Sequence, residues 1–219
     1  MKRLPPKLRR SLHKREPLRR FIIFCEGKNT EPSYFVALKQ ANKKALIDID
    51  IAGGCGVPYT IAEKASAEAE RLGLNGKGRR KLNSFEERDE IWAVFDRDEH
   101  PRFEEAITLC ESRRVKVARS NPCFELWLIL HVCDFDRPDD RKSVQKYLKG
   151  LRPEYDPDHR KILNCEELLQ DIESAEKRAK NLLDRREQER SPFGPPSTTV
   201  GHLTQAIREA AESAQKAAD

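Results

Sequence analysis

The chain has 219 residues, enough to bury a core in one domain with appendages. No run approaches the roughly 20 apolar residues of a membrane span, and the apolar run that ends at Glu26 is too short for a secretory signal. Six scattered cysteines without zinc-binding spacing favour buried thiols over a zinc site or disulfides, so we expect a cytoplasmic protein without membrane contact.

Positive charge is concentrated at the N-terminus. Residues 1–20 hold nine basic residues against one acid, Glu16, whereas the rest of the chain holds 33 basic against 36 acidic residues. Three prolines and little apolar periodicity predict a basic flexible arm over residues 1–19. Such an arm either contacts nucleic acid or acts as a solubilising tail.

Short apolar runs and amphipathic stretches alternate from residue 20 onward. The runs predict strands and the stretches predict helices; the strands are expected at about 20–25, 45–53, 90–96 and 115–120, and the helices at about 31–44, 58–72 and 101–113. This order predicts an α/β core over residues 20–132, with a mainly parallel four-stranded sheet flanked by helices. The strand at 45–53 alternates apolar and acidic residues, which is typical of a sheet edge.

The second half of the chain is predicted to be helical. A helix over about 120–132 is apolar almost all round and is therefore expected to be buried, with Ser120 or Asn121 as its cap. Residues 133–219 are predicted to form a helical extension that packs on the core, with helices near 141–149, over 165–190 and from about 201.

Three acidic side chains lie where predicted strands end. Glu26 ends the first strand, Asp96 ends the third, and Asp98 follows with one residue between. Because ligand sites in parallel sheets lie at the carboxyl ends of the strands, we expect these acids to converge. Together they would offer hard oxygen ligands of the kind that Mg²⁺ or Mn²⁺ prefers. The alternative is that each acid caps the helix that follows it.

Glu125 is the one ionisable group in the apolar stretch "PCFELWLIL". A buried carboxylate is costly unless it is paired with a cation, a metal or a hydrogen-bond donor. It is expected near the same sheet edge, because it follows the fourth strand directly. It either belongs to the acidic site or forms a structural ion pair.

The blocks "FCEGKNTE" and "VFDRDEH" resemble the Toprim signature of topoisomerases, bacterial primases and the overcoming-lysogenization-defect nucleases. With "SNPCFELWLILH" and "PSTTVGHL", they resemble the RloB-like family, whose members are encoded near phage-defence genes, often beside an ATPase. The resemblance implies a Toprim-like fold in which Glu26 acts as general acid or base and Asp96 and Asp98 bind metal. It also marks Asn121, Glu125 and His131 as supporting positions.

This resemblance implies metal-dependent cleavage of RNA or DNA. Lys28 and Arg97 are candidate phosphate contacts beside the acids; as alternatives, Lys28 is an exposed loop lysine and Arg97 merely covers the metal site. His131 is expected to be a packed residue at a helix end rather than a base. A basic loop would either track the nucleic-acid backbone or remain solvated; its cations are Lys77, Arg79, Arg80 and Lys81.

Three classes of function remain open from the sequence. The first is a Toprim nuclease in anti-phage defence. The second keeps the fold but makes the chain a catalytically silent nucleic-acid-binding or sensor subunit, and the third is a nucleotidyl transferase or primase-like synthase. The chain lacks a G-x-x-x-x-G-K-[ST] loop, so we expect any ATPase activity to reside in a partner.

Overall fold

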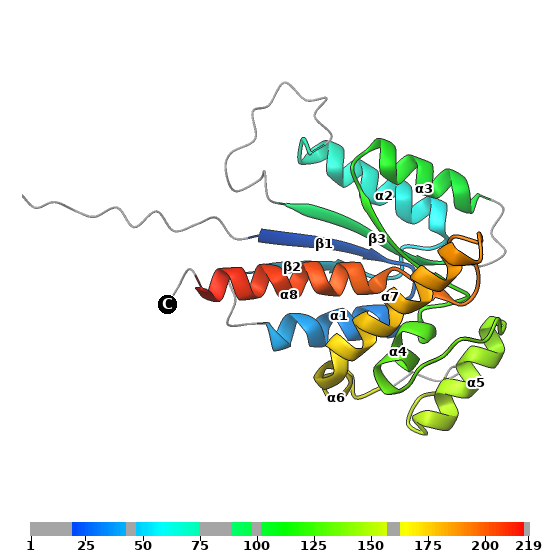
Figure 1. Ribbon diagram of the computed structural model, residues 1–219. Helices are drawn as coiled ribbons and strands as arrows, with labels where there is room; N and C mark the ends of the chain where they lie inside the picture. Colours follow the sequence, from blue (N-terminus) through cyan, green and yellow to red (C-terminus); the bar gives the residue numbers. More distant parts are fainter. Residues whose placement is uncertain (1–18, 43–46, 75–88, 98–101, 157–162, 217–219) are drawn as a thin grey trace, which may run out of the picture.

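The computed structural model describes residues 19–42, 47–74, 89–97, 102–156 and 163–216 (Figure 1). A five-stranded sheet runs through it in the order β2-β1-β3-β4-β5. The first four strands are parallel, and the last is antiparallel to β4. Their bounds are β1 Arg19–Cys25, β2 Ile47–Ala52, β3 Glu90–Asp96, β4 Lys116–Asn121 and β5 Ser197–Thr198.

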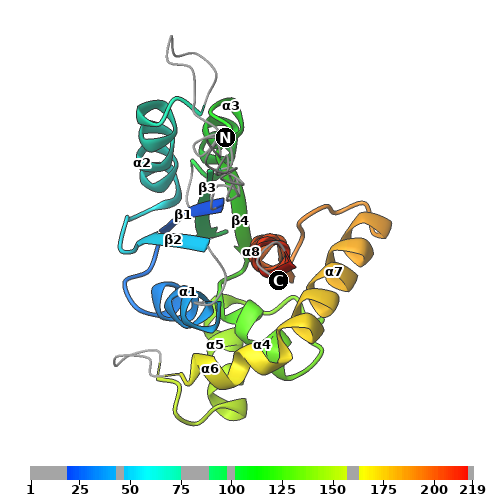
Figure 2. The same cartoon turned by 90° about the vertical axis from the view of Figure 1, so that its left-hand side faces the viewer.

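Helices cover both faces of the sheet (Figure 2). One face carries α2 (Pro58–Arg71) and α3 (Phe103–Ser112). The other carries α1 (Thr30–Ala41), α4 (Glu125–Val132) and α8 (Val200–Lys216), with α7 (Ile172–Gln188) outside them. Successive side chains of a strand point to opposite faces of the sheet, so the sheet has a hydrophobic core on each face. Phe21 and Ile23 belong to the core on the α1 side, and Ile22 between them belongs to the core on the α2 side.

Three short elements complete the helical part. They are α5 (Arg141–Leu151), α6 (Cys165–Leu168) and the 3₁₀ turn η2 (Leu169–Asp171). The predicted single helix over 165–190 is therefore wrong, because η2 separates α6 from α7. The apolar residues of this stretch, among them Leu168, Ile172 and Leu182, are nevertheless buried against the core.

The α/β class is confirmed, but the prediction of four strands is wrong. The fifth strand, β5, has only two residues and pairs Thr198 with Ser120. Two polar residues after a proline pair carry none of the apolar signal that marks a strand. Because β5 lies within the predicted helical extension, that segment also contributes to the sheet.

Two predicted boundaries also need correction. Arg19 belongs to β1 rather than to the N-terminal arm, whose other residues lie outside the described part. Neither Ser120 nor Asn121 caps α4: both lie in β4, and α4 starts at Glu125 without a side-chain cap. The chain turns from β4 into α4 through Pro122 and Phe124.

None of the described helices combines the length and apolar character that crossing a membrane requires.

Candidate functional site

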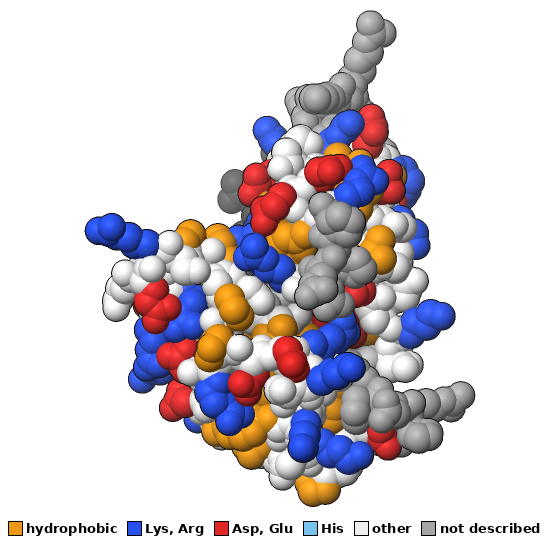
Figure 3. All heavy atoms as spheres, turned by 90° about the vertical axis from the view of Figure 1, so that its right-hand side faces the viewer, with side chains coloured by type: hydrophobic (Ala, Val, Ile, Leu, Met, Phe, Trp, Pro, Cys, Tyr) orange, Lys and Arg blue, Asp and Glu red, His pale blue; other side chains and the backbone are white. Residues whose placement is uncertain are grey.

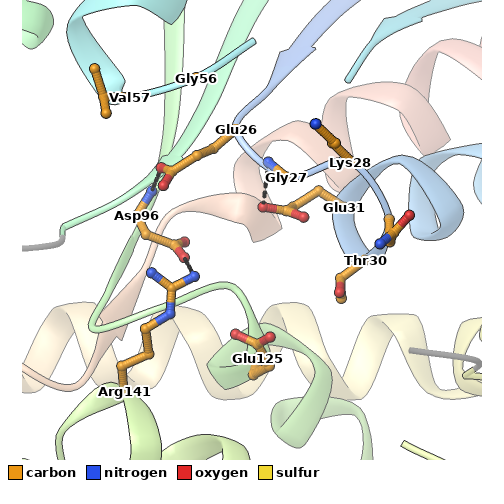
Figure 4. A pocket seen from close by; sticks show the side chains of 11 residues that line it. Glu26, Gly27, Lys28, Thr30, Glu31, Gly56, Val57, Asp96, Glu125 and Arg141 are labelled. Carbon is orange, nitrogen blue, oxygen red and sulfur yellow. Dashed lines mark hydrogen bonds and ion pairs between the residues drawn. The ribbon is translucent and has the colours of Figure 1, made fainter. Parts of the chain in front are cut away.

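β1 and β3 end side by side, and this register sets the site. Cys25 of β1 lies opposite Val94 of β3, and the Glu26 N–H donates to the Val94 carbonyl over 3.2 Å. The Glu26 carboxylate then accepts a hydrogen bond of 3.2 Å from the Asp96 N–H (Figure 4). The structure thus brings Glu26 and Asp96 together, as expected for acids at the carboxyl ends of parallel strands. Asp98 lies outside the described residues.

Glu31 adds a third carboxylate from the first turn of α1. It is 7 % exposed, and one of its oxygens accepts a hydrogen bond of 3.2 Å from the Gly27 N–H. A Cβ added to Gly27 would lie 2.1 Å from a Glu31 carboxylate oxygen. The glycine after Glu26 therefore leaves the space that Glu31 occupies.

Glu125 adds a fourth carboxylate from the start of α4. Its side chain points toward the same pocket and is almost fully buried (Figure 4). The Tyr155 hydroxyl donates a hydrogen bond of 2.6 Å to Glu125, and the Gln145 amide donates another of 3.3 Å. Burial, followed by the neighbouring Glu125 carboxylate, raises the pKa of Tyr155, which keeps this hydroxyl a donor.

Replacing Tyr155 with phenylalanine is expected to lower the free energy of unfolding by about 1–3 kcal/mol, because it removes a donor from a buried carboxylate. Urea denaturation measures the change. In a Glu125→Gln background the same replacement should cost less, since the acceptor is then uncharged. An equal loss in both backgrounds would mean that Tyr155 stabilises the fold through packing alone.

These acids surround a pocket of about 360 Å³. Two cations face them: Lys28 from the turn after β1, and Arg141 from the first residue of α5. The Arg141 guanidinium lies 3.6 Å from the Asp96 carboxylate, whereas no described acid forms an ion pair with Lys28. Four carboxylates against two cations leave the pocket with an excess of acidic groups.

Burial, together with this excess of carboxylates over cations, raises the pKa values of Asp96 and Glu31. Burial, and then the charges of Glu31, Glu125 and Glu26, raise the pKa of Asp96 well above the ordinary aspartate value, while Arg141 opposes the rise. Burial also raises the pKa of Glu31, with further repulsion from Glu125 and Glu26. A bound cation would relieve this repulsion.

Of the residues that the structure describes, four carboxylates and no His or Cys side chain line the pocket. Hard divalent cations such as Mg²⁺ prefer oxygen ligands, so these residues fit such an ion. Within the described ranges, however, no three Asp, Glu, His or Cys side chains are grouped closely enough to hold an ion. Asp98 is not among the described residues. The described carboxylates would therefore need to move toward one another around an ion.

Of the other predicted residues, Lys28 lies at the acids, whereas Arg97, Asn121 and His131 do not line the pocket. Arg97 lies over the Phe103 ring and donates to the Phe193 carbonyl over 3.5 Å. Asn121 donates to the same carbonyl over 2.9 Å. All four predicted cations of the basic loop, Lys77, Arg79, Arg80 and Lys81, lie outside the described residues.

His131 is buried within the α4 layer rather than in the pocket. It contacts the Tyr34 hydroxyl over 3.1 Å and the Leu168 carbonyl over 2.7 Å. Burial lowers its pKa to about 4, although the Leu168 carbonyl favours the protonated form. At neutral pH His131 is therefore an uncharged packing residue.

Sequence reasoning missed Glu31 and Arg141. Glu31 had a signal, because it lies in the first turn after the Glu26 strand and close to it in the chain. Arg141 had none, because it comes from a helix beyond the predicted core. Only the packing of α5 against α4 places its guanidinium beside Asp96.

The fold and pocket define an α/β protein whose acidic residues meet at the carboxyl edge of parallel strands. Comparison with protein-family models matches residues 21–207 to the family described as RloB-like protein. The chain therefore belongs to the RloB-like family, which confirms the resemblance in its sequence blocks. No match was found among curated proteins or among solved structures.

Proposed function

We propose that this protein is a divalent-metal-dependent nuclease that hydrolyses phosphodiester bonds of RNA or DNA. The observation that carries the proposal is the convergence of Glu26, Asp96, Glu31 and Glu125 on one pocket at the carboxyl ends of β1 and β3. Ligand sites of parallel sheets lie at this edge. The Toprim-like resemblance of the Glu26 and Asp96 blocks supports the same reading.

Glu26, Asp96 and Asp98 would hold Mg²⁺ or Mn²⁺ through carboxylate oxygens, with Glu31 close by. When bound, the ion supplies charge neutralisation at the phosphate and a lowered pKa for a water molecule. Glu26 keeps its position through the Asp96 N–H, so its carboxylate can accept a proton from the attacking water. Lys28, exposed at the pocket rim, would pair with a non-bridging phosphate oxygen.

Arg141 has a second role in this proposal. Its guanidinium offsets the Asp96 charge in the protein without an ion. Once a cation neutralises Asp96, the guanidinium would be released toward the phosphate, where a planar donor binds two oxygens at once. The pocket would then hold the phosphodiester between Lys28 and Arg141.

Incubation of the purified protein with mixed single-stranded RNA and DNA tests the proposal. Cleavage is expected with Mg²⁺ or Mn²⁺ and not with EDTA, and a Glu26→Gln variant should lose at least about 100-fold in rate. Glu63, exposed on α2, provides the matched control as Glu63→Gln. Equal rates for Glu26→Gln and wild type, or cleavage by neither, would contradict the assignment.

The proposed setting is prokaryotic anti-phage defence with an ATPase partner. Both points rest on the resemblance to RloB-like proteins encoded near defence genes. The partner would supply ATP hydrolysis, because this chain has no G-x-x-x-x-G-K-[ST] loop. The cleavage assay is therefore run with and without the product of the neighbouring ATPase gene, and cleavage by neither preparation would favour a silent binding subunit.

A further inference from the structure

Helix α5 presents an unusual solvent face. Its sequence "RKSVQKYLKGL" contains four cations and no acid. Lys142, Lys146 and Lys149 are exposed and spaced four and three residues apart, so they share one face of the helix. Val144 and Leu148 are buried on the opposite face. At 1.5 Å per residue, the lysine face extends over about 10 Å.

The three lysines have no ion-pair partner among the described acids. Asp140 attracts Lys142, but its carboxylate caps the helix through a hydrogen bond of 2.7 Å from the Ser143 N–H. Figure 3 shows Lys and Arg side chains in the lower part of this face of the molecule, where α5 lies, among acidic and hydrophobic side chains. This face therefore carries cations that the fold itself does not use.

The helix that carries the lysine face starts at the acidic pocket. Arg141 lines the pocket, and Lys142 follows it on the same helix. The same helix thus carries a pocket cation at its first residue and, from the next residue on, a row of exposed lysines. A pocket of acids alone would repel a polyanion, so a substrate with a phosphate backbone needs neighbouring cations to approach it.

The surface offers charge rather than base stacking. Tyr147, the aromatic residue of α5, is half-buried, and the Arg137 guanidinium covers its ring at 4.5 Å. Backbone contacts by lysines give affinity that is independent of sequence and sensitive to salt. The face therefore fits a phosphate backbone and not a particular base.

The pocket favours a single strand. Asp96 is only 3 % exposed, so a phosphodiester must enter the pocket to reach it. A single strand can bend its backbone into a space of about 360 Å³, whereas the strands of a duplex are held by pairing and stacking. The strand that enters at Arg141 would continue along α5.

We propose that Lys142, Lys146 and Lys149 form a binding face for the backbone of single-stranded nucleic acid, which leads the strand to the pocket. The inference rests on the proposed nuclease function only for the fate of the strand. Binding to the three lysines is a separate property, because none of them lines the acidic pocket.

Fluorescence anisotropy with labelled 20-nucleotide single strands, RNA and DNA of one sequence, tests the proposal in EDTA. The triple variant Lys142→Gln, Lys146→Gln, Lys149→Gln should bind at least about tenfold more weakly than wild type. The slope of log affinity against log salt should fall by about 2, since each lost phosphate contact contributes about 0.7. Comparing the two strands shows which backbone is preferred.

The control removes the same charge from other helices, as Lys39→Gln, Lys177→Gln, Lys216→Gln on α1, α7 and α8. It should bind as wild type does. An unchanged slope in the α5 variant, an equal loss in the control, or tighter binding of a duplex would overturn the proposal. Glu26→Gln should bind the strand as wild type does but not cleave it. If the α5 variant binds more weakly while wild type shows no cleavage under any condition, the result contradicts the nuclease function and leaves the binding face supported.

Discussion

Replacing Asp96 with asparagine is expected to reduce metal-dependent cleavage by at least about 100-fold. The substitution keeps the shape of the side chain but removes a carboxylate oxygen that would bind the metal under the proposed function, so several kcal/mol of transition-state stabilisation would be lost. Initial cleavage rates at saturating Mg²⁺ measure the effect. Asp134, exposed and paired only loosely with Arg178, provides the control as Asp134→Asn.

The same variant should gain stability in the absence of metal. Folding buries Asp96 among three other carboxylates, so Asp96→Asn is expected to raise the free energy of unfolding by about 0.5–2 kcal/mol at pH 7. A protein that is less active and more stable is typical of a site whose charges serve binding rather than folding. If the variant is less stable, the ion pair between Arg141 and Asp96 stabilises the fold by more than the repulsion among the carboxylates destabilises it.

The pH dependence of this gain has a definite sign. The pKa of Asp96 is raised in the folded protein, so the folded state keeps a proton that the unfolded chain has already released. Wild type therefore loses stability as the pH rises from the ordinary aspartate value toward the raised one. Urea denaturation in EDTA should show the difference in free energy of unfolding between variant and wild type widening over that range. A difference that stays constant with pH would mean that the raised pKa of Asp96 is not its cause.

The sequence predicts the parallel strands well, because each is a short apolar run followed by a polar turn. The acids at the ends of β1 and β3 could be located for the same reason, because parallel strands bring their carboxyl ends to one edge of the sheet. The edge position predicted for the second strand is confirmed, since β2 ends the sheet. Where periodicity and topology suffice, sequence analysis located the acids that meet at this edge of the sheet.

It failed where tertiary packing decides. β5 consists of Ser197 and Thr198, and its pairing with β4 depends on how the chain returns after α7. Arg141 reaches the pocket only because α5 packs on α4. The predicted cap at Ser120 or Asn121 was wrong because both residues belong to β4, and the Asn121 amide instead donates to the Phe193 carbonyl, far away in the chain.

Replacing Trp127 with alanine is expected to cause the largest loss of stability, about 3–5 kcal/mol, which corresponds to a fall in melting temperature of about 6–20 °C. Trp127 is fully buried on α4, and its ring meets His131 at 4.9 Å and Tyr34 at 6.2 Å between centroids. Gly201 of α8 lies against the same ring, since a Cβ added there would be 3.5 Å from it, an ordinary van der Waals contact.

This loss should also reach the pocket, because α4 carries Glu125 one half-turn before Trp127. Calorimetry would measure the stability of Trp127→Ala beside Val36→Ala, which removes an exposed side chain and should change it by less than about 0.5 kcal/mol. Cleavage at a temperature where Trp127→Ala remains folded would then separate the two effects. A normal rate there would show that α4 only stabilises the fold, whereas a reduced rate would show that the aromatic layer under α4 also holds Glu125 in position.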